Sequence, residues 1–298
     1  MLRQGRFPRI RTQPVTACEA FQRRDFFLAQ FYLSSCAGRS KHRPNYLHLQ
    51  PDQLQPQPHA APAVAAGVSQ RTIAEASPYL VYDQGIVNRD RGQRVFGQVF
   101  TEFAGRMAAH YRMQQGQARI KAHATAFARA EKEYGVPPAV IAAFWGLESD
   151  FGANMGNLPT LRSLVSLAYD CRRSQMFANE TIAALKIIGR GDLAPEEMVG
   201  SWAGELGQTQ FLPTHYFNYA VDYDGDGRRD LLRSPADVIG STANYIANGL
   251  KWRRGEPWLQ EVRVAHNLAA GFPWDQADLT IQLPRSRSST AAISRPMR

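Results

Sequence analysis

The chain has 298 residues, of which 44% are hydrophobic, and its 35 basic and 26 acidic side chains give a net charge of +9 at pH 7. This hydrophobic content is typical of a globular protein and excludes a wholly disordered or fibrous chain. No apolar run approaches the roughly 20 residues that a membrane-spanning helix needs. The excess positive charge lies in the tails, because residues 71–273 carry 22 basic and 21 acidic side chains. The sequence therefore gives no support to nucleic-acid binding.

Residues 1–66 have the composition of a largely disordered tail that contains a signal or a linker. Five prolines between Pro44 and Pro62, interleaved with Gln and His, argue against packed structure. Ahead of them, a basic pair and a short apolar stretch lead to Cys36, as in a bacterial lipoprotein signal. We therefore expect export and a membrane anchor on a lipidated Cys36. The alternative is an irregular tail or a start codon placed too early.

The organised pattern follows, in a predicted domain over residues 67–284. Apolar spacing predicts mainly α structure, without a run of alternating strands between residues 70 and 250. We expect Cys171 to be a small buried residue of a helix. Short strands are predicted at Val262 and at 279–283, and residues 285–298 are predicted to be a tail. The helices are expected to begin at Ser69 and to cover 95–107, 120–134, 160–170, 175–189 and 235–250, with another starting at Pro137-Pro138.

Glu148 is the first candidate for chemistry because it extends a helical stripe formed by Ile141 and Trp145. Loss of hydration in such surroundings raises the pKa of a carboxyl group, which then stays protonated near neutral pH. A protonated carboxyl can donate to a glycosidic oxygen. The alternative is an outward-facing Glu148 paired with Arg162 or Arg172, and position alone favours this alternative.

The segment from Gly200 to Pro213 is the second candidate because it combines three glycines with Gln208 and Gln210. Small residues let a ligand approach the backbone, and a glutamine amide offers a donor and an acceptor to an acetamido sugar. The alternative is a glycine-rich loop between helices. The unusual composition favours a binding segment.

A third segment has the acidic pattern of a calcium loop. Its expected ligands fill EF-hand positions 1, 3, 5, 7 and 9, with a glycine at position 6. Position 12 is Arg233 instead of glutamate, so a later aspartate would complete a lengthened loop. The alternative is a solvated Asp/Gly turn. The preceding stretch is too short for an entering helix, which favours a structural Ca2+ ion over a sensor. The expected ligands are Asp222, Asp224, Asp226, the Arg228 carbonyl, Asp230 and Asp237.

Three ordered motifs resemble the B family of bacterial lytic murein transglycosylases. They are GVPP with GLESDFG at 135–152, GSWAGELGQTQFLP at 200–213, and AVDYDGDG with GSTANY at 220–245. The resemblance covers roughly residues 67–284. It implies a lysozyme-like helical domain with an inserted calcium loop. It also implies that Glu148 is the single catalytic acid and that Ser201, Gln210 and Tyr111 line the sugar-binding cleft.

The resemblance further implies non-hydrolytic cleavage of the β-1,4 bond between N-acetylmuramic acid and N-acetylglucosamine. Glu148 would protonate the leaving oxygen and then accept the proton of the muramic C6 hydroxyl, which closes a 1,6-anhydro ring. Glycosidases that use two carboxylates differ in this respect, and no second carboxylate is evident from the sequence. Family members continue beyond the equivalent of Pro284, so we expect a C-terminally incomplete domain.

These observations predict a monomeric lytic transglycosylase that acts on peptidoglycan strands. Its expected location is the periplasm or outer membrane of a Gram-negative bacterium, and no nucleic-acid partner is expected. Two alternatives remain. One is a non-catalytic murein-binding protein with an incomplete cleft, and the other is a calcium-dependent interaction module.

Overall fold

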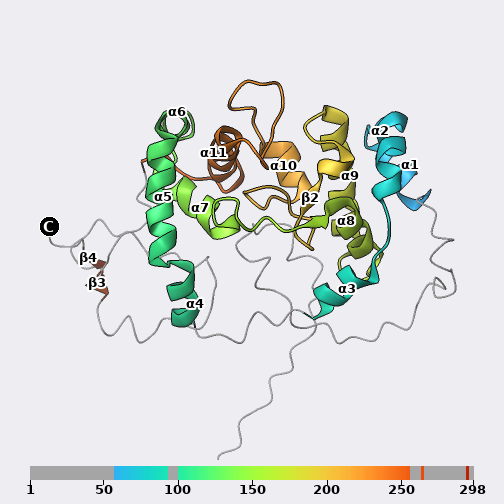
Figure 1. The fold of residues 1–298 in the computed structure, drawn as a ribbon, viewed down its shortest axis with the longest axis horizontal. Coiled ribbons are helices and arrows are strands. Elements are labelled where there is room, and N and C mark those ends of the chain that lie inside the picture. Colours follow the sequence, from blue (N-terminus) through green and yellow to red (C-terminus); the bar gives the residue numbers. More distant parts are fainter. Residues whose placement is uncertain (1–56, 93–99, 256–262, 265–292, 295–298) are drawn as a thin grey trace, which may run out of the picture. The chain divides into compact units, whose positions relative to one another are not determined.

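A computed structural model describes residues 57–92, 100–255, 263–264 and 293–294. The chain divides into two units, Met1–Trp252 and Arg253–Arg298. Helices dominate the described part of the first unit (Figure 1). The mainly α class predicted from the sequence is therefore confirmed.

The described part of the first unit begins with three short helices. Ser69 caps the second of them by accepting a hydrogen bond from the Thr72 backbone N–H. The first helix lies inside the segment expected to be a disordered tail, yet Ala63 is fully buried. The expectation was wrong for these residues because the alanine-rich run packs on a later helix, α9 (Ser174–Arg190). The three helices are α1 (Gln57–Ala65), α2 (Gln70–Ala76) and α3 (Gln84–Arg91), with a 3-10 turn, η3 (Ser77–Tyr79), after α2.

The helix predicted over residues 120–134 is interrupted. Helix α5 (His110–Ala122) ends at His123, whose φ of −116° and ψ of 34° lie outside the helical region. Helix α6 (Ala124–Tyr134) then begins and ends at Gly135 with φ 71°, as expected for a glycine after a helix. Helix α4 (Phe100–Met107) matches the described part of the helix predicted over 95–107.

Helix α7 (Pro138–Ser149) begins directly after Pro137, as the paired prolines predict. Its last turn carries Glu148. Helix α8 (Thr160–Tyr169) then packs against α9, and both agree with the predicted ranges. Cys171 follows α8 and is exposed, so the expected buried position was wrong because the helix ends at Tyr169.

Two very short strands join the start of α8 to the glycine-rich segment. Strand β1 (Leu158–Pro159) pairs antiparallel with β2 (Val199–Gly200), which follows a 3-10 turn, η5 (Pro195–Glu197). A two-residue strand is too short to produce an alternating pattern, which is why the sequence did not reveal it. The pairing brings the segment 200–213 beside the region that follows α7.

Helices α10 (Pro213–Tyr219) and α11 (Pro235–Asn244) flank the acidic segment, which forms the loop between them in Figure 1. Ser234 caps α11 by accepting from the Asp237 backbone N–H. A π-helical turn, η6 (Tyr245–Gly249), continues α11. The predicted helix over 235–250 is therefore an α-helix that ends in a wider turn.

Two groups of buried side chains form the core of the first unit. One contains residues of α8, α9 and α10, together with the first three helices, and includes Leu164 and Phe177. The other joins α6, α7 and α11 around Trp145, Ile239 and Tyr223. Since α7 belongs to the second group, the catalytic candidate is carried by the same packed layer as the acidic loop.

In the second unit, strand β3 (Arg263–Val264) pairs antiparallel with β4 (Ile293–Ser294). Strand β4 lies within the predicted tail 285–298, so that expectation is wrong at these two residues, which have a pairing partner. The strands predicted at Val262 and 279–283 lie outside the described residues, as does the signal at Cys36. Among the helices of the described residues, none combines the length and apolarity needed to span a bilayer.

Candidate active site and acidic loop

Glu148 differs in solvent exposure from Ile141 and Trp145, with which the helical spacing grouped it. Ile141 and Trp145 are almost fully buried on α7, whereas Glu148 is exposed. The predicted extension of the buried stripe to Glu148 was therefore wrong, because the core covers the middle of α7 and not this side of its last turn. The alternative pairing is also absent: Arg172 pairs with Asp90, and no ion pair of Glu148 occurs among the described residues.

The pKa of Glu148 is nevertheless raised to about 7. The larger cause is partial desolvation of the carboxyl group by the surrounding protein, and the smaller is the negative charge of Glu205. A carboxyl with this pKa exchanges its proton near neutral pH. Because the residue remains exposed, a ligand can reach that proton.

Glu205 is the functional candidate that sequence reasoning missed. Its carboxylate accepts a hydrogen bond from Ser201 Oγ at 2.8 Å, and its backbone carbonyl accepts from the Ser201 N–H at 3.1 Å. Burial raises the pKa of Glu205, while the Ser201 hydrogen bond and the charge of Arg173 act in the opposite direction. A second carboxyl group therefore lies within electrostatic reach of Glu148. No local pattern marks it, because the two residues belong to distant segments.

Gln210 lies in the same loop with a left-handed φ of 49° and is almost fully buried. Its side-chain Nε2 donates to the Met155 carbonyl at 3.2 Å and to the Gly207 carbonyl at 2.8 Å. These bonds brace the loop against the segment that follows α7. They leave the side-chain carbonyl oxygen of Gln210 as the atom that can accept from a ligand.

Tyr111 stands on α5 and is about half exposed, at 48%. Its hydroxyl donates to the Asp150 carboxylate at 3.1 Å and accepts from the Arg112 guanidinium at 3.0 Å. Arg112 also pairs with Asp150 at 2.7 Å and holds the pKa of that carboxyl below its usual range. Asp150 directly follows α7, so Tyr111 is tied to the end of the helix that carries Glu148.

Gln208 joins the end of α7 to the glycine-rich loop. Its side-chain oxygen accepts from the Trp145 indole N–H at 2.9 Å, and its backbone carbonyl accepts from Ser149 Oγ at 2.6 Å. All three residues are buried. The sequence segment thus contains two glutamines with different environments: Gln210 braces the loop, and Gln208 attaches it to α7.

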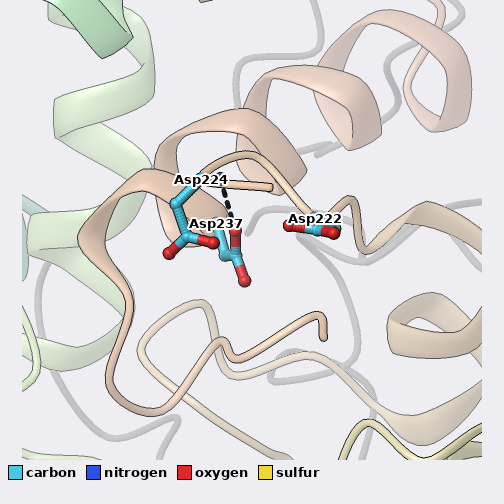
Figure 2. A group of neighbouring side chains, drawn as sticks. All are labelled: Asp222, Asp224 and Asp237. Carbon is cyan, nitrogen blue, oxygen red and sulfur yellow. Dashed lines mark hydrogen bonds between the residues drawn. The ribbon is translucent and has the colours of Figure 1, made fainter. Parts of the chain in front are cut away.

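Two carboxylates of the acidic loop converge with one from the first turn of α11. Asp222, Asp224 and Asp237 each offer an oxygen within 4.8 Å of the others (Figure 2). Asp237 is fully buried, and one of its oxygens accepts from the Tyr223 N–H at 2.6 Å. Burial raises the pKa of Asp237. The expected contribution of Asp237 from outside the twelve-residue loop therefore has a geometric basis.

The other expected ligands lie outside this group of three carboxylates. Asp226 accepts from the Arg228 backbone N–H at 2.8 Å, and Asp230 pairs with Arg233 at 2.7 Å. The Arg228 side chain donates to the Asp192 carbonyl at 2.8 Å. Three clustered carboxylate oxygens on a glycine-containing loop fit a hard divalent cation such as Ca2+. The donor set therefore fits the ion. Asp222, Asp224 and Asp237 belong both to the ligands predicted from the sequence and to the carboxylates that cluster in the structure.

The chain is similar to known proteins in sequence and in fold. The chain is 36% identical over 163 residues to membrane-bound lytic murein transglycosylase B of Escherichia coli strain K12, covering 54% of this chain and 44% of that protein. Two crystal structures of SltB3 from Pseudomonas aeruginosa, in complex with NAG-anhNAM-pentapeptide and with NAG-NAM-pentapeptide, share 40% sequence identity with this chain. They superpose with TM-scores of 0.67 and 0.68, over 75% of this chain and 58% and 59% of theirs.

The Escherichia coli lytic transglycosylase Slt35 in complex with calcium is 27% identical, with a TM-score of 0.62 over 72% of this chain and 69% of that one. The chain spans less than two thirds of the length of the Escherichia coli transglycosylase B and of SltB3. The transglycosylase SLT domain family matches residues 53–295, more than the sequence resemblance covered. By this match, the chain belongs to the transglycosylase SLT domain family.

Proposed function

We propose that the protein is a lytic transglycosylase that cleaves the β-1,4 bond between N-acetylmuramic acid and N-acetylglucosamine in peptidoglycan. The observation that carries this proposal is the exposed Glu148 carboxyl with a pKa near 7 at the end of α7. Relatives that share the fold have been crystallised with peptidoglycan fragments, which supports glycan strands as the substrate class.

The proposed reaction uses Glu148 twice. Its proton passes to the glycosidic oxygen as the bond from C1 to that oxygen breaks. The muramic C6 hydroxyl then attacks C1, and its proton returns to the Glu148 carboxylate. The products are a 1,6-anhydromuramic end and a free N-acetylglucosamine hydroxyl, and the acid is regenerated. A pKa near 7 suits both proton transfers.

Ser201, Gln210 and Tyr111 are proposed to contact the sugar. Glu205 accepts the hydrogen bond of Ser201 Oγ, so Ser201 is oriented by a carboxylate before any ligand binds. In this proposal Glu205 raises the proton affinity of Glu148 and does not attack the substrate. The muramic C6 hydroxyl takes the part that a nucleophilic carboxylate or water plays in glycosidases.

The presence of Glu205 near Glu148 supports one second candidate, a hydrolytic muramidase, because hydrolases use paired carboxylates. Digestion of purified sacculi followed by mass spectrometry separates the two candidates. We expect muropeptides that end in 1,6-anhydromuramic acid, and products with reducing ends only would favour hydrolysis. Glu148→Gln should abolish release of either product. Sacculus binding without any release would instead indicate a murein-binding protein.

The acidic loop is proposed to hold a structural Ca2+ ion through Asp222, Asp224 and Asp237. Asp226, Asp230 and the Arg228 carbonyl are proposed as further ligands, as their loop positions predict. A bound ion would screen the carboxylates from one another and fix the loop. A relative with the same fold has been crystallised with calcium, which supports the choice of ion.

We further propose that the protein acts as a monomer at the cell envelope. The Escherichia coli relative is described as membrane-bound, which supports a periplasmic or outer-membrane location. Anchoring through a lipidated Cys36 remains a prediction from the sequence. Mass spectrometry of the protein extracted from membranes would detect the acyl groups.

A further inference from the structure

Gln208 is buried and makes four hydrogen bonds that link two parts of the molecule. Two of them, from Trp145 Nε1 and Ser149 Oγ, hold the last two turns of α7. The other two run to the segment that follows the acidic loop. The Gln208 N–H donates to the Leu231 carbonyl at 2.8 Å, and its side-chain Nε2 donates to the Leu232 carbonyl at 2.9 Å. The side chain and the backbone of one residue thus bridge α7 and residues 231–232.

The segment bound by Gln208 is itself attached to the acidic loop. The Asp230 N–H donates to Asp237 Oδ2 at 2.7 Å. The other oxygen of Asp237 accepts from the Tyr223 and Asp224 N–H groups at 2.6 and 3.3 Å. A continuous series of short polar contacts therefore runs from the clustered carboxylates, through residues 230–232 and Gln208, to α7.

We propose that Gln208 is a positioning residue that couples the acidic loop to the catalytic helix, so that a divalent cation on the loop sets the orientation of Glu148. This inference rests on the proposed function of Glu148 and of the loop. Glu148 lies between Trp145 and Ser149 in sequence, and Gln208 contacts both of these residues. Any displacement of residues 230–232 is therefore transmitted to the turn that carries the acid.

Close packing leaves this bridge little freedom to adjust. Gln208, Trp145 and Ser149 are each less than a tenth exposed. A Cβ atom at Gly152 would lie 2.6 Å from the Gln208 side-chain oxygen, so the glutamine fills the space left by that glycine. A buried polar bridge with every partner in place has one favourable arrangement. Misplacement of a catalytic group by about 1 Å can lower a rate on the order of 100-fold.

The experiment compares the wild type with Gln208→Met, Trp145→Phe and a control, Gln84→Met. Methionine removes both side-chain bonds of Gln208 at similar length, and phenylalanine removes the indole donor together with part of the ring volume. Gln84 is an exposed glutamine of α3 that bonds to Asn88. The activity of each protein on sacculi is measured with calcium and with a chelator, and calcium affinity is measured by calorimetry.

We expect chelation to lower kcat of the wild type several-fold with KM within about twofold. Gln208→Met should lower kcat on the order of 10-fold in calcium, and chelation should then change kcat by less than about twofold. The kcat of Trp145→Phe and its change on chelation should lie between those of the wild type and Gln208→Met. Gln84→Met should respond to chelation as the wild type does. Calcium should bind Gln208→Met more weakly, because coupling between two sites acts in both directions.

Hydrogen exchange supplies a readout that does not depend on catalysis. In the wild type, calcium should slow amide exchange in residues 222–237 and also in residues 145–152. In Gln208→Met, calcium should slow exchange in residues 222–237 alone. If Gln208→Met fails to fold, Trp145→Phe is expected to give the same separation in weaker form.

Several outcomes would overturn the coupling. One is a Gln208→Met protein that melts earlier but keeps the wild-type kcat and the wild-type response to chelation, since a purely structural residue behaves in this way. Another is a wild type that binds no calcium, or whose residues 145–152 exchange equally with and without it. Failure of the proposed function gives a different result: the wild type releases no 1,6-anhydro product, while the exchange measurements still decide the coupling.

Discussion

Glu205 places a negative charge within reach of Glu148, and this defines a first expectation for the pH dependence of activity. In the proposed reaction Glu148 must be protonated to act, so kcat/KM should fall as pH rises through about 7. Glu205→Gln removes the repelling charge and should move this decline to lower pH. Desolvation is the larger cause of the raised pKa, so the midpoint should stay above the ordinary value for glutamic acid. The pH profile of kcat/KM measures the shift.

A matched control for this variant is Glu75→Gln, which changes an exposed carboxylate paired with Arg71 on α2. Its pH profile should coincide with that of the wild type. A Glu205→Gln profile that also coincides with the wild type would contradict the proposed electrostatic role.

Glu148→Gln tests the same pKa through stability. In the folded protein Glu148 keeps its proton up to about pH 7, whereas in the unfolded chain it loses the proton near pH 4.5. Stability is therefore lost as pH rises from 4.5 to 7. Glutamine does not titrate, so the variant should melt at a higher temperature than the wild type at pH 8, with no such gain at pH 4. Calorimetry at both pH values provides the measurement, and an equal difference at both would refute the linkage.

At the residue scale, the sequence revealed the groups whose roles follow from local pattern. Glu148 was predicted from the helical period of Ile141 and Trp145 and from the family motif that contains it. Its exposure matches the alternative of an outward-facing side chain, but without the expected arginine partner among the described residues. Glu205 and Gln208 were not identified as parts of one site with Glu148. Their partners lie on α7, and no one-dimensional pattern reports a contact between distant segments.

At the scale of elements, α11 owes its close approach to the acidic loop to Gly240. Alanine normally favours a helix by about 1 kcal/mol over glycine. At this position, however, a Cβ would overlap the ring of Tyr223. We expect Gly240→Ala to lower the free energy of unfolding by about 1–3 kcal/mol, as overpacking does. Urea denaturation at constant m-value checks this change.

Gly105 provides the comparison, because it also lies in a helix, α4, and a Cβ there would meet no atom of the described residues within 4 Å. Gly105→Ala should stabilise the protein by about 0.4–1 kcal/mol. Stabilisation by both substitutions would show that Tyr223 moves aside without cost.

The helices that were placed correctly have chemical markers at their ends. Gly135 and Pro137-Pro138 separate α6 from α7, and Ser69 starts α2. The break at His123 has no such marker, because apolar residues continue through it in helical phase. The π-helical turn after α11 is invisible for the same reason. These two features depend on packing with other elements, which the order of residues does not specify.

At the scale of the whole molecule, a cation on the acidic loop should stabilise the entire first unit. A ligand at 100 times its Kd that binds only the folded state adds about 2.7 kcal/mol. For a domain of this size that corresponds to about 5–11 °C in Tm. We expect a rise of this order between chelated and calcium-saturated protein in a thermal scan.

Substitutions in the loop show which carboxylates are responsible. Asp224→Asn changes one of the three convergent residues and should remove most of the calcium-dependent rise in Tm. Asp226→Asn changes an aspartate outside that group, so this variant should retain most of the calcium-dependent rise in Tm. Equal losses from the two substitutions would favour the ligand set read from the loop positions, which contains both aspartates.

The close passage of two chain segments next to Ser201 limits how this site can vary. A Cβ at Gly156 would collide with the Gly200 carbonyl, and a Cβ at Gly200 would collide with the Glu205 carbonyl. In both cases the obstacle is backbone, which no neighbouring side-chain change can remove. A randomised library selected for function should therefore return glycine at both positions. Gly105 of α4 has no left-handed φ, and a Cβ there would meet no atom of the described residues within 4 Å, so it should accept more replacements. The positions at which only glycine is recovered would then mark the edge of the site, and no bound ligand is needed to find them.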